Sequence, residues 1–154
     1  EITDEIQSIN SPVICTCTTL GEIAEAAGAI RIDRPMMRRA AETWGDILLV
    51  YALKSTEQPS MTLLQQEMDK ANNPYTIAPL FLNRHWPLFE AGHPHAFARG
   101  LAMDIRAVLA QRGGIKAVVL AQASMSGAAM LLSDLTVPVL SSPVLALKEG
   151  LSQL

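Results

Sequence analysis

Apolar runs of strand length alternate with amphipathic stretches along this chain. The apolar runs predict strands at residues 11–16, 45–53, 75–82, 115–122 and 137–140. Apolar residues at helical spacing predict helices at residues 19–28, 34–44, 61–71, 95–114, 126–134 and 142–154. Between these elements, the polar segment 54–60 is predicted to form a turn and residues 83–94 an irregular connection.

Several predicted elements carry signals at their ends. Thr19 with Glu22 three residues later forms a capping-box pattern, so a helix should begin just after Thr19 and end at Gly28. The face of this helix predicted to point inward contains Leu20, Ile23, Ala24 and Ala27. Pro79 interrupts the strand at 75–82, which places that strand at an edge of its sheet or close to its own end.

The order of the predicted elements indicates the fold class. Strands that are apolar throughout and alternate with helices are typical of a parallel sheet covered by helices on both faces. We therefore predict an α/β fold. In such sheets ligands bind beyond the carboxyl ends of the strands, so functional residues are expected at strand-to-helix turns.

Composition narrows the class of partners. Hydrophobic residues make up 49% of the 154 residues and charged residues 18%, which is a globular composition. A net charge of −3 argues against nucleic acid, and the short basic cluster at 34–39 is expected to be a solvated helix face. No apolar run reaches the ~20 residues that a membrane span requires. The two cysteines, one residue apart, are poorly spaced for a disulfide and favour a reducing, cytoplasmic setting.

Polar side chains follow three of the predicted strands. The turns are Cys17-Thr18-Thr19, Lys54-Ser55-Thr56 and Gln122-Ala123-Ser124. Hydroxyl groups and free backbone N–H groups at helix starts bind anions, carboxylates included. The first and third turns align in register when Val13 is set against Val118, so Cys17 matches Gln122. This alignment indicates an internal duplication.

Cys17 is the candidate catalytic residue. It lies at the carboxyl end of a predicted strand and two residues before the predicted N-cap, where backbone amide groups stabilise a thiolate. A thiolate in this position could act as a nucleophile or as a base on carbon. Ordinary burial is the competing interpretation of both cysteines. Burial suits Cys15 better, because Cys15 lies deeper in the strand.

A metal centre is the weaker interpretation of the two cysteines. His85, His93 and His95 form one loop cluster, and no series of aspartates accompanies them. We therefore expect no metal.

These turns resemble those of the aspartate/glutamate racemase superfamily, which includes glutamate, aspartate and hydantoin racemases, maleate isomerase and arylmalonate decarboxylase. The resemblance covers nearly all of the chain. It is carried by "CTCTTLG", "VYALKSTEQPS" and "VVLAQASMSGAA" followed by "VPVLSSP", in that order.

The resemblance implies two pseudo-symmetric α/β domains with the active site between them, each contributing one cysteine from a strand-to-helix turn. Cys17 would be the first catalytic cysteine, and Ser55 and Thr56 would help to hold a substrate carboxylate. The other expected substrate-binding residues are Thr18, Thr19, Gln122, Ala123 and Ser124.

One residue departs sharply from the family pattern, because Gln122 stands where the second thiol should be. A glutamine side chain is neither an acid nor a base. Two-base racemisation is therefore disfavoured on chemical grounds, whereas chemistry with a single thiol is retained. In that chemistry Gln122 could orient a carboxylate or an amide of the substrate.

Family members also have a strand–helix portion before the first cysteine motif, where this chain has only ten residues before Ser11. Unless that portion is merely not included in this sequence, we therefore expect an N-terminally truncated first domain, made of residues 1–44 and joined by helix 142–154, and a second domain at residues 45–141. An incomplete sheet exposes an edge unless a partner chain completes it, so we expect a homo-oligomer.

The sequence thus predicts a cofactor-independent enzyme that acts on a small carboxylic acid through one thiol. Its reaction class stays open among racemase-like isomerase, lyase and decarboxylase. The alternatives are a binding protein that has lost turnover and a structural core without a complete site.

Overall fold

The computed structural model describes residues 2–152, and its largest element is a parallel sheet of four strands. The strand order is β4-β3-β5-β6, with β3 at Asp46–Tyr51, β4 at Ile77–Phe81, β5 at Ile115–Leu120 and β6 at Val139–Ser141. β4 is an edge strand, as Pro79 predicted, and this position spares Pro79 one of the two neighbours that a central strand must bond. The predicted α/β class is confirmed.

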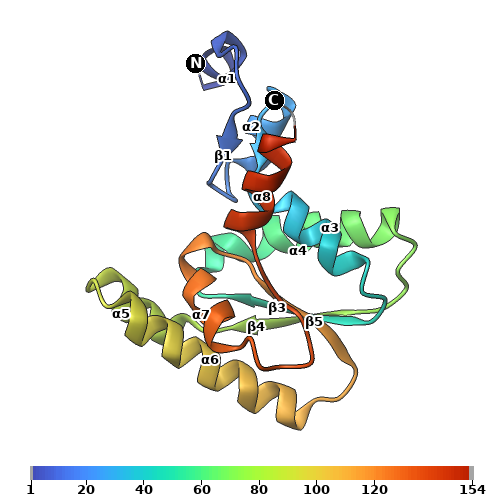
Figure 1. Cartoon of the computed structure of the whole chain (residues 1–154), viewed down its shortest axis with the longest axis vertical. Helices are drawn as coiled ribbons and strands as arrows, with labels where there is room; N and C mark the ends of the chain where they lie inside the picture. The colour runs from blue at the N-terminus through green and yellow to red at the C-terminus, as the bar shows by residue number, and fades with distance from the viewer. Residues whose placement is uncertain (1, 153–154) are drawn as a thin grey trace.

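Helices cover both faces of this sheet (Figure 1). On one face lie α3 (Arg34–Ala41) and α4 (Lys54–Lys70), and on the other α6 (Pro94–Gln111) and α7 (Ser126–Leu131). Alternate residues of β3 enter the two cores, since Ile47 and Leu49 pack with α3 and α4 whereas Leu48 and Val50 pack with α6 and α7. The continuous apolar run in β3 therefore serves two cores at once.

A second, smaller sheet lies beyond α3 and α4, at the top of Figure 1. Its two parallel strands are β1 (Ile14–Cys15) and β2 (Ile30–Arg31), joined through α2 (Gly21–Ala26). α8 (Ser142–Leu151) returns from the end of β6 and packs on this unit so closely that a Cβ added at Gly150 would lie 3.3 Å from Cδ1 of Ile14. α1 (Ile2–Ser8) precedes β1 in the chain. The division into two domains at residues 1–44 with 142–154 and 45–141 stays a prediction, and residues 153–154 of the predicted last helix lie outside the described residues.

Segment 54–60 is not the predicted turn. It forms the first two turns of α4, with Pro59 inside the helix. Proline there removes one intrahelical hydrogen bond, but the helix that continues past it buries Leu63 and Leu64 in the core, and this packing outweighs the lost bond. Three short elements were not predicted: α1, β2 and α5 (Trp86–Glu90), the last preceded by the 3₁₀ turn η1 (Asn83–His85).

The first strand–helix unit is also more open than predicted. β1 has only two residues and both are half-buried, whereas a buried strand was expected over 11–16. The N-cap of α2 is Leu20, and no side chain caps the helix, so the predicted Thr19–Glu22 capping box is wrong. Leu20 and Ile23 are 42% and 53% exposed, because only the Ala24 and Ala27 side of α2 is covered.

Among residues 2–152, no helix combines the length and the apolar character that crossing a membrane requires.

Candidate functional site

Cys17 lies in the turn between β1 and α2, and its side chain is exposed. Cys15, two residues earlier, is half-buried, and its thiol donates a hydrogen bond to the carbonyl oxygen of Cys17 at 3.6 Å. The two cysteines therefore differ as the sequence predicted, with Cys17 open and Cys15 partly covered. Ordinary burial does not account for Cys17.

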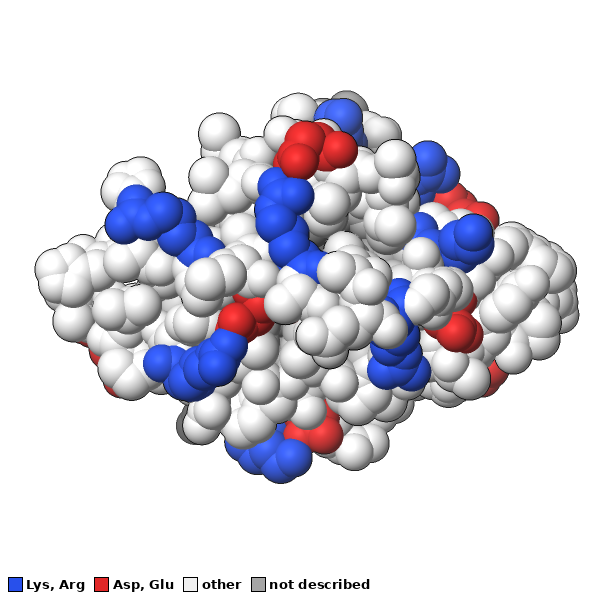
Figure 2. Space-filling model, turned by 90° about the horizontal axis from the view of Figure 1, so that it is seen from below, with Lys and Arg blue, Asp and Glu red and all other residues white. Residues whose placement is uncertain are grey.

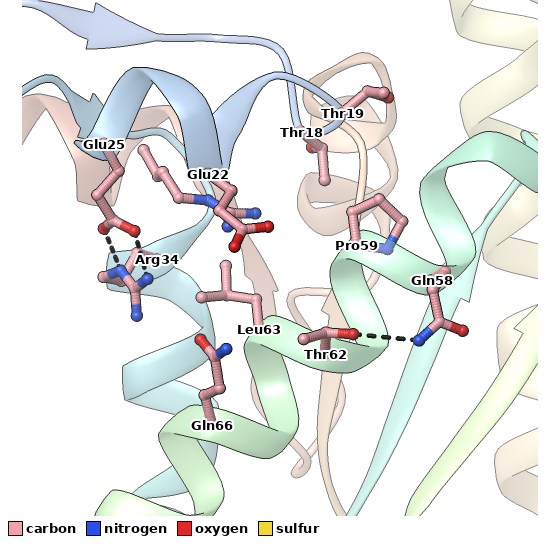
Figure 3. Close-up of a pocket in the computed structure, with 11 residues that line it drawn as sticks. Thr18, Thr19, Glu22, Glu25, Arg34, Gln58, Pro59, Thr62, Leu63 and Gln66 are labelled. Atoms are coloured by element: carbon pink, nitrogen blue, oxygen red, sulfur yellow. Dashed lines mark hydrogen bonds and ion pairs between the residues drawn. The ribbon is translucent and has the colours of Figure 1, made fainter. Parts of the chain in front are cut away.

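A cavity of about 340 Å³ adjoins this turn. Thr18 and Thr19 line one wall, and Gln58, Pro59 and Thr62 of α4 line the wall opposite (Figure 3). Cys17 adjoins the cavity through Thr18 rather than lining it. The cavity thus separates the small sheet unit from the helix that follows β3, and it has the size of a small-molecule site.

The cavity contains two arginines, and both are already neutralised. Arg31 is buried and makes two 3.0 Å hydrogen bonds to the carboxylate of Asp33. Arg34 pairs with Glu25, as Figure 3 shows, and also with Glu67. The hydrogen bond to Glu25 raises the pKa of the Arg34 guanidinium, against burial, which acts to lower it. An anionic ligand would therefore find no free guanidinium group here.

Other polar groups of this cavity are available to a ligand. The carboxylate of Glu22 lines it with no hydrogen bond or ion pair to any other described residue. The amide of Gln58 donates to Thr62 Oγ1 at 3.1 Å, which leaves the amide oxygen free, and Gln66 lies deeper along α4 (Figure 3). Carboxylate and amide oxygens accept hydrogen bonds, so this part of the cavity suits a ligand that carries N–H groups.

Gln122, at the turn after β5, is nine-tenths buried and hydrogen-bonded. Its side-chain oxygen accepts hydrogen bonds from the backbone N–H groups of Ala52 at 2.7 Å and Leu53 at 3.1 Å. These N–H groups lie at the end of β3, just before α4. The side chain thus joins the turn after β5 to the turn after β3.

The predicted substrate-binding residues do not gather around one cavity. Thr18 and Thr19 line the cavity beside Cys17, whereas Ser124 lines a different hollow. Ser55 is exposed and Thr56 buried in the first turn of α4, and neither of them, nor Gln122 or Ala123, lines the first cavity.

The sequence interpretation missed the charged residues of this site. Arg34 and Arg38 belong to the basic cluster that was expected to be solvated, but Arg34 is largely buried and Arg38 pairs with Glu149 at 3.2 Å. Carboxylates brought to this cluster from α2, α4 and α8 pair with it, and no local sequence signal predicts such contacts. Among the described residues, no group of three or more His, Cys, Asp or Glu side chains could hold a metal ion, and His85 pairs instead with Asp104 at 2.6 Å.

Comparison with known proteins supplies a match in structure alone. No protein-family model and no curated protein matches the sequence. The solved structure of allantoin racemase from Klebsiella pneumoniae matches with a TM-score of 0.67 over 98% of this chain, at 20% sequence identity. This chain spans 64% of that protein. Allantoin racemase belongs to the Asp/Glu racemase superfamily, so the resemblance predicted from the turn motifs is confirmed at the level of the fold.

Proposed function

We propose that this chain is a cofactor-independent enzyme of the racemase superfamily that acts on a small carboxylic acid through the single thiol of Cys17. The observation that supports it best is the exposure of Cys17 at a strand-to-helix turn whose next two residues line a cavity. Parallel α/β sheets bind their ligands at such turns. The fold shared with allantoin racemase supports the same assignment.

The cavity also indicates what the substrate contains. Because Arg31 and Arg34 are paired with carboxylates, the substrate carboxylate would bind to hydroxyl and N–H groups of the turn at Thr18 and Thr19. Glu22 and the amides of Gln58 and Gln66 would accept hydrogen bonds from N–H groups at the other end of the molecule. The proposed substrate is therefore a small acid that also carries an amine, amide or ureido group.

The reaction would use one face of the substrate carbon. In a decarboxylation, the bond to the departing carboxyl group breaks and its electrons remain on the substrate as an enediolate. The Cys17 thiol then delivers a proton to carbon, and water reprotonates the thiolate. In an isomerisation, the Cys17 thiolate adds to a carbon–carbon double bond of the substrate. The substrate then rotates about this bond, which is now single, and elimination restores both the double bond and the thiolate. Gln122 supports one-face chemistry, because it can neither take nor give a proton.

Proton NMR in D₂O on a panel of small acids would test the proposal. A thiol confined to one face of the substrate carbon should also remove an α-proton and return a deuteron on that same face. We therefore expect deuterium to enter at the α-carbon with retention of configuration for at least one acid, and Cys17→Ser to slow this exchange by about 10²- to 10⁴-fold. Cys15→Ser is the matched control and should leave the rate little changed. Exchange with inversion would contradict the single-base mechanism, and equal loss in both variants would contradict the assignment of Cys17.

Alkylation offers a check that needs no substrate. Iodoacetamide should label Cys17 faster than Cys15, because Cys15 is half-buried and its thiol is engaged with the Cys17 carbonyl group. Peptide mass spectrometry at short reaction times distinguishes the two sites. Faster labelling of Cys15 would count against the proposal.

A binding protein without turnover is the second candidate. The observation that favours it is that the Gln122 side chain links the turn after β5 to the turn after β3 by hydrogen bonds. A second catalytic group would be needed at the position that Gln122 occupies. Calorimetry that detects binding of a small acid, unchanged by Cys17→Ser and without exchange at carbon, would select this function over the first.

A further inference from the structure

A second hollow, of about 420 Å³, lies between α6 and the segment that follows β5. His95 and Arg99 of α6 form one side of it, and Ser124, Ser126, Met130 and Leu131 form the other. It shares no lining residue with the cavity beside Cys17. The proposed function makes no use of it.

The electrostatics of this hollow differ from those of the first cavity. The side chains of Arg99 and His95, one helical turn apart, have no hydrogen bond or ion pair to any other described residue, and no Asp or Glu lines the hollow. Nearby arginines are neutralised, since Arg106 pairs with Asp134 and Arg84 with Asp104. Figure 2 shows the molecule from below the view of Figure 1, the side on which α6 lies, and Lys and Arg side chains are interspersed there with Asp and Glu side chains. Arg99 therefore offers an uncompensated positive charge beside a concave surface.

Two hydroxyl groups add hydrogen-bonding capacity. The Ser124 oxygen is buried and has no hydrogen-bond partner among the described residues, and Ser126 lies at the start of α7. A buried hydroxyl without a partner costs free energy. Because Ser124 lines the hollow, a change of its rotamer can present the hydroxyl to an acceptor bound there.

The remaining wall is apolar and open. Met130 is 79% exposed and Leu131 45% exposed, although both belong to a helix that otherwise packs on the core. A short apolar group placed against them would be removed from water, which is favourable in proportion to the area buried.

We propose that this hollow binds a small organic anion. Its carboxylate or phosphate head group would pair with Arg99 and accept hydrogen bonds from Ser124 and Ser126, and its short apolar portion would cover Met130 and Leu131. The guanidinium group is well suited to either head group, because its N–H groups match two oxygens at once.

Amide NMR titrations with hexanoate and with hexyl phosphate, at constant ionic strength, would test this proposal. We expect saturable shifts confined to the amides of residues 95–99 and 124–131. Arg99→Gln should weaken binding of the preferred anion about tenfold or more. Arg112→Gln removes the same charge at the opposite end of α6 and should change the affinity less than about twofold, as expected for a screened distant charge. The tighter of the two anions identifies the head group.

A second variant, at a different wall of the hollow, checks that a loss of binding in Arg99→Gln is not an indirect effect of that substitution. Met130→Asp places a negative charge on an exposed position of the apolar wall and should abolish binding without unfolding the chain. Arg99→Gln should also leave deuterium exchange at the substrate carbon unchanged, which separates this site from the one beside Cys17. Linear shifts without saturation, or equal losses for Arg99→Gln and Arg112→Gln, would show only non-specific charge attraction and would overturn the proposal.

Discussion

The units β1-α2-β2 and β5-α7-β6 have the same local design in different surroundings. β1 ends at Cys15 and β5 at Leu120, while α2 spans Gly21–Ala26 and α7 spans Ser126–Leu131, so both boundaries recur 105 residues later. The same spacing relates Cys17 to Gln122. The equal spacing from the end of each strand to the following helix, and the equal length of the two helices, support the internal duplication that the sequence alignment indicated.

The surroundings decide what each turn can do. β5 lies between β3 and β6, so Gln122 reaches the backbone at the end of β3. β1 pairs with β2 alone among the described strands, and the position that corresponds to β3 beside Cys17 is not filled by a strand. A glutamine at the enclosed turn therefore becomes a structural link, whereas a cysteine at the open turn remains accessible to solvent and ligand.

The largest expected effect follows from removing the link. Gln122→Ala leaves the N–H groups of Ala52 and Leu53 without their acceptor, in a largely buried place, and should lower the free energy of unfolding by about 3 kcal/mol. Urea denaturation followed by circular dichroism measures the change. Gln65→Ala, which removes an exposed side chain bonded to Asp69 on the same helix, is the control and should cost less than about 0.5 kcal/mol. If Gln122→Ala lowers the free energy of unfolding as little as the control does, water replaces the Gln122 amide oxygen as the acceptor for these two N–H groups.

The two units also differ in what attaches them to the rest of the chain. β5 and β6 are joined to the main sheet by backbone hydrogen bonds and apolar packing. Ion pairs contribute much to the attachment of the small unit, above all through Arg34, which bridges Glu25 of α2 and Glu67 of α4. Glu67 is 3% exposed and also accepts a 2.8 Å hydrogen bond from Lys70. The attachment of the β1-α2-β2 unit should therefore be weakened more than that of the β5-α7-β6 unit when a carboxylate is neutralised.

Glu67→Gln tests this difference at an intermediate magnitude. Burial alone would raise the pKa of Glu67, but hydrogen bonds from Lys70 and Arg34 outweigh it and lower the pKa below its usual value near 4.5. The ionised carboxylate thus contributes stability that is complete above the pKa of the unfolded state and is lost as pH falls through the lower folded value. We expect the variant to cost about 2 kcal/mol at pH 7, and this cost to shrink as pH falls below the unfolded-state pKa and through the lower folded value.

Hydrogen exchange localises the effect of this variant. In Glu67→Gln at pH 7, amide protection should fall at residues 14–31 more than at residues 115–131. Equal losses in both regions would show that the ion pairs stabilise the whole fold rather than the attachment of the small unit. Glu42→Gln, an exposed carboxylate paired with Arg39, is the matched control.

The sequence predicted the main four-stranded sheet and α6 well and the β1-α2-β2 unit poorly, for a physical reason. β3, β5 and α6 are buried on the faces that their apolar patterns indicate, so pattern and burial agree. In α2 the apolar residues Leu20 and Ile23 remain exposed, because the cover that the pattern assumes is not supplied by the described residues. Pro59 was interpreted as a turn residue because local sequence cannot show the packing that retains it within α4.

The candidate site likewise has features that the sequence predicted and features that it did not. The exposure of Cys17 and its neighbourhood with Thr18 and Thr19 follow from local chain order, and the sequence predicted them. The role of Gln122 depends on a contact with Ala52, 70 residues away, and the neutralisation of Arg34 on one with Glu67, 33 residues away. Such contacts depend on the folded topology and leave no periodic signal in the sequence.

The smallest expected effect concerns the first residue of each short helix. Gly21 begins α2, and a Cβ there would lie 2.6 Å from Nε of Arg31, whereas the corresponding first residue of α7 is Ser126. Arg31 cannot move freely, because it is buried and held by Asp33. Gly21→Ala should therefore destabilise the chain by about 1 kcal/mol in urea denaturation, the gain in helix propensity offsetting part of the crowding. Gly113→Ala, where an added Cβ meets no atom within 4 Å, should be neutral or slightly stabilising. If Gly21→Ala matches the parent chain in stability, Arg31 yields easily, and the wall of the cavity beside Cys17 is adaptable rather than fixed.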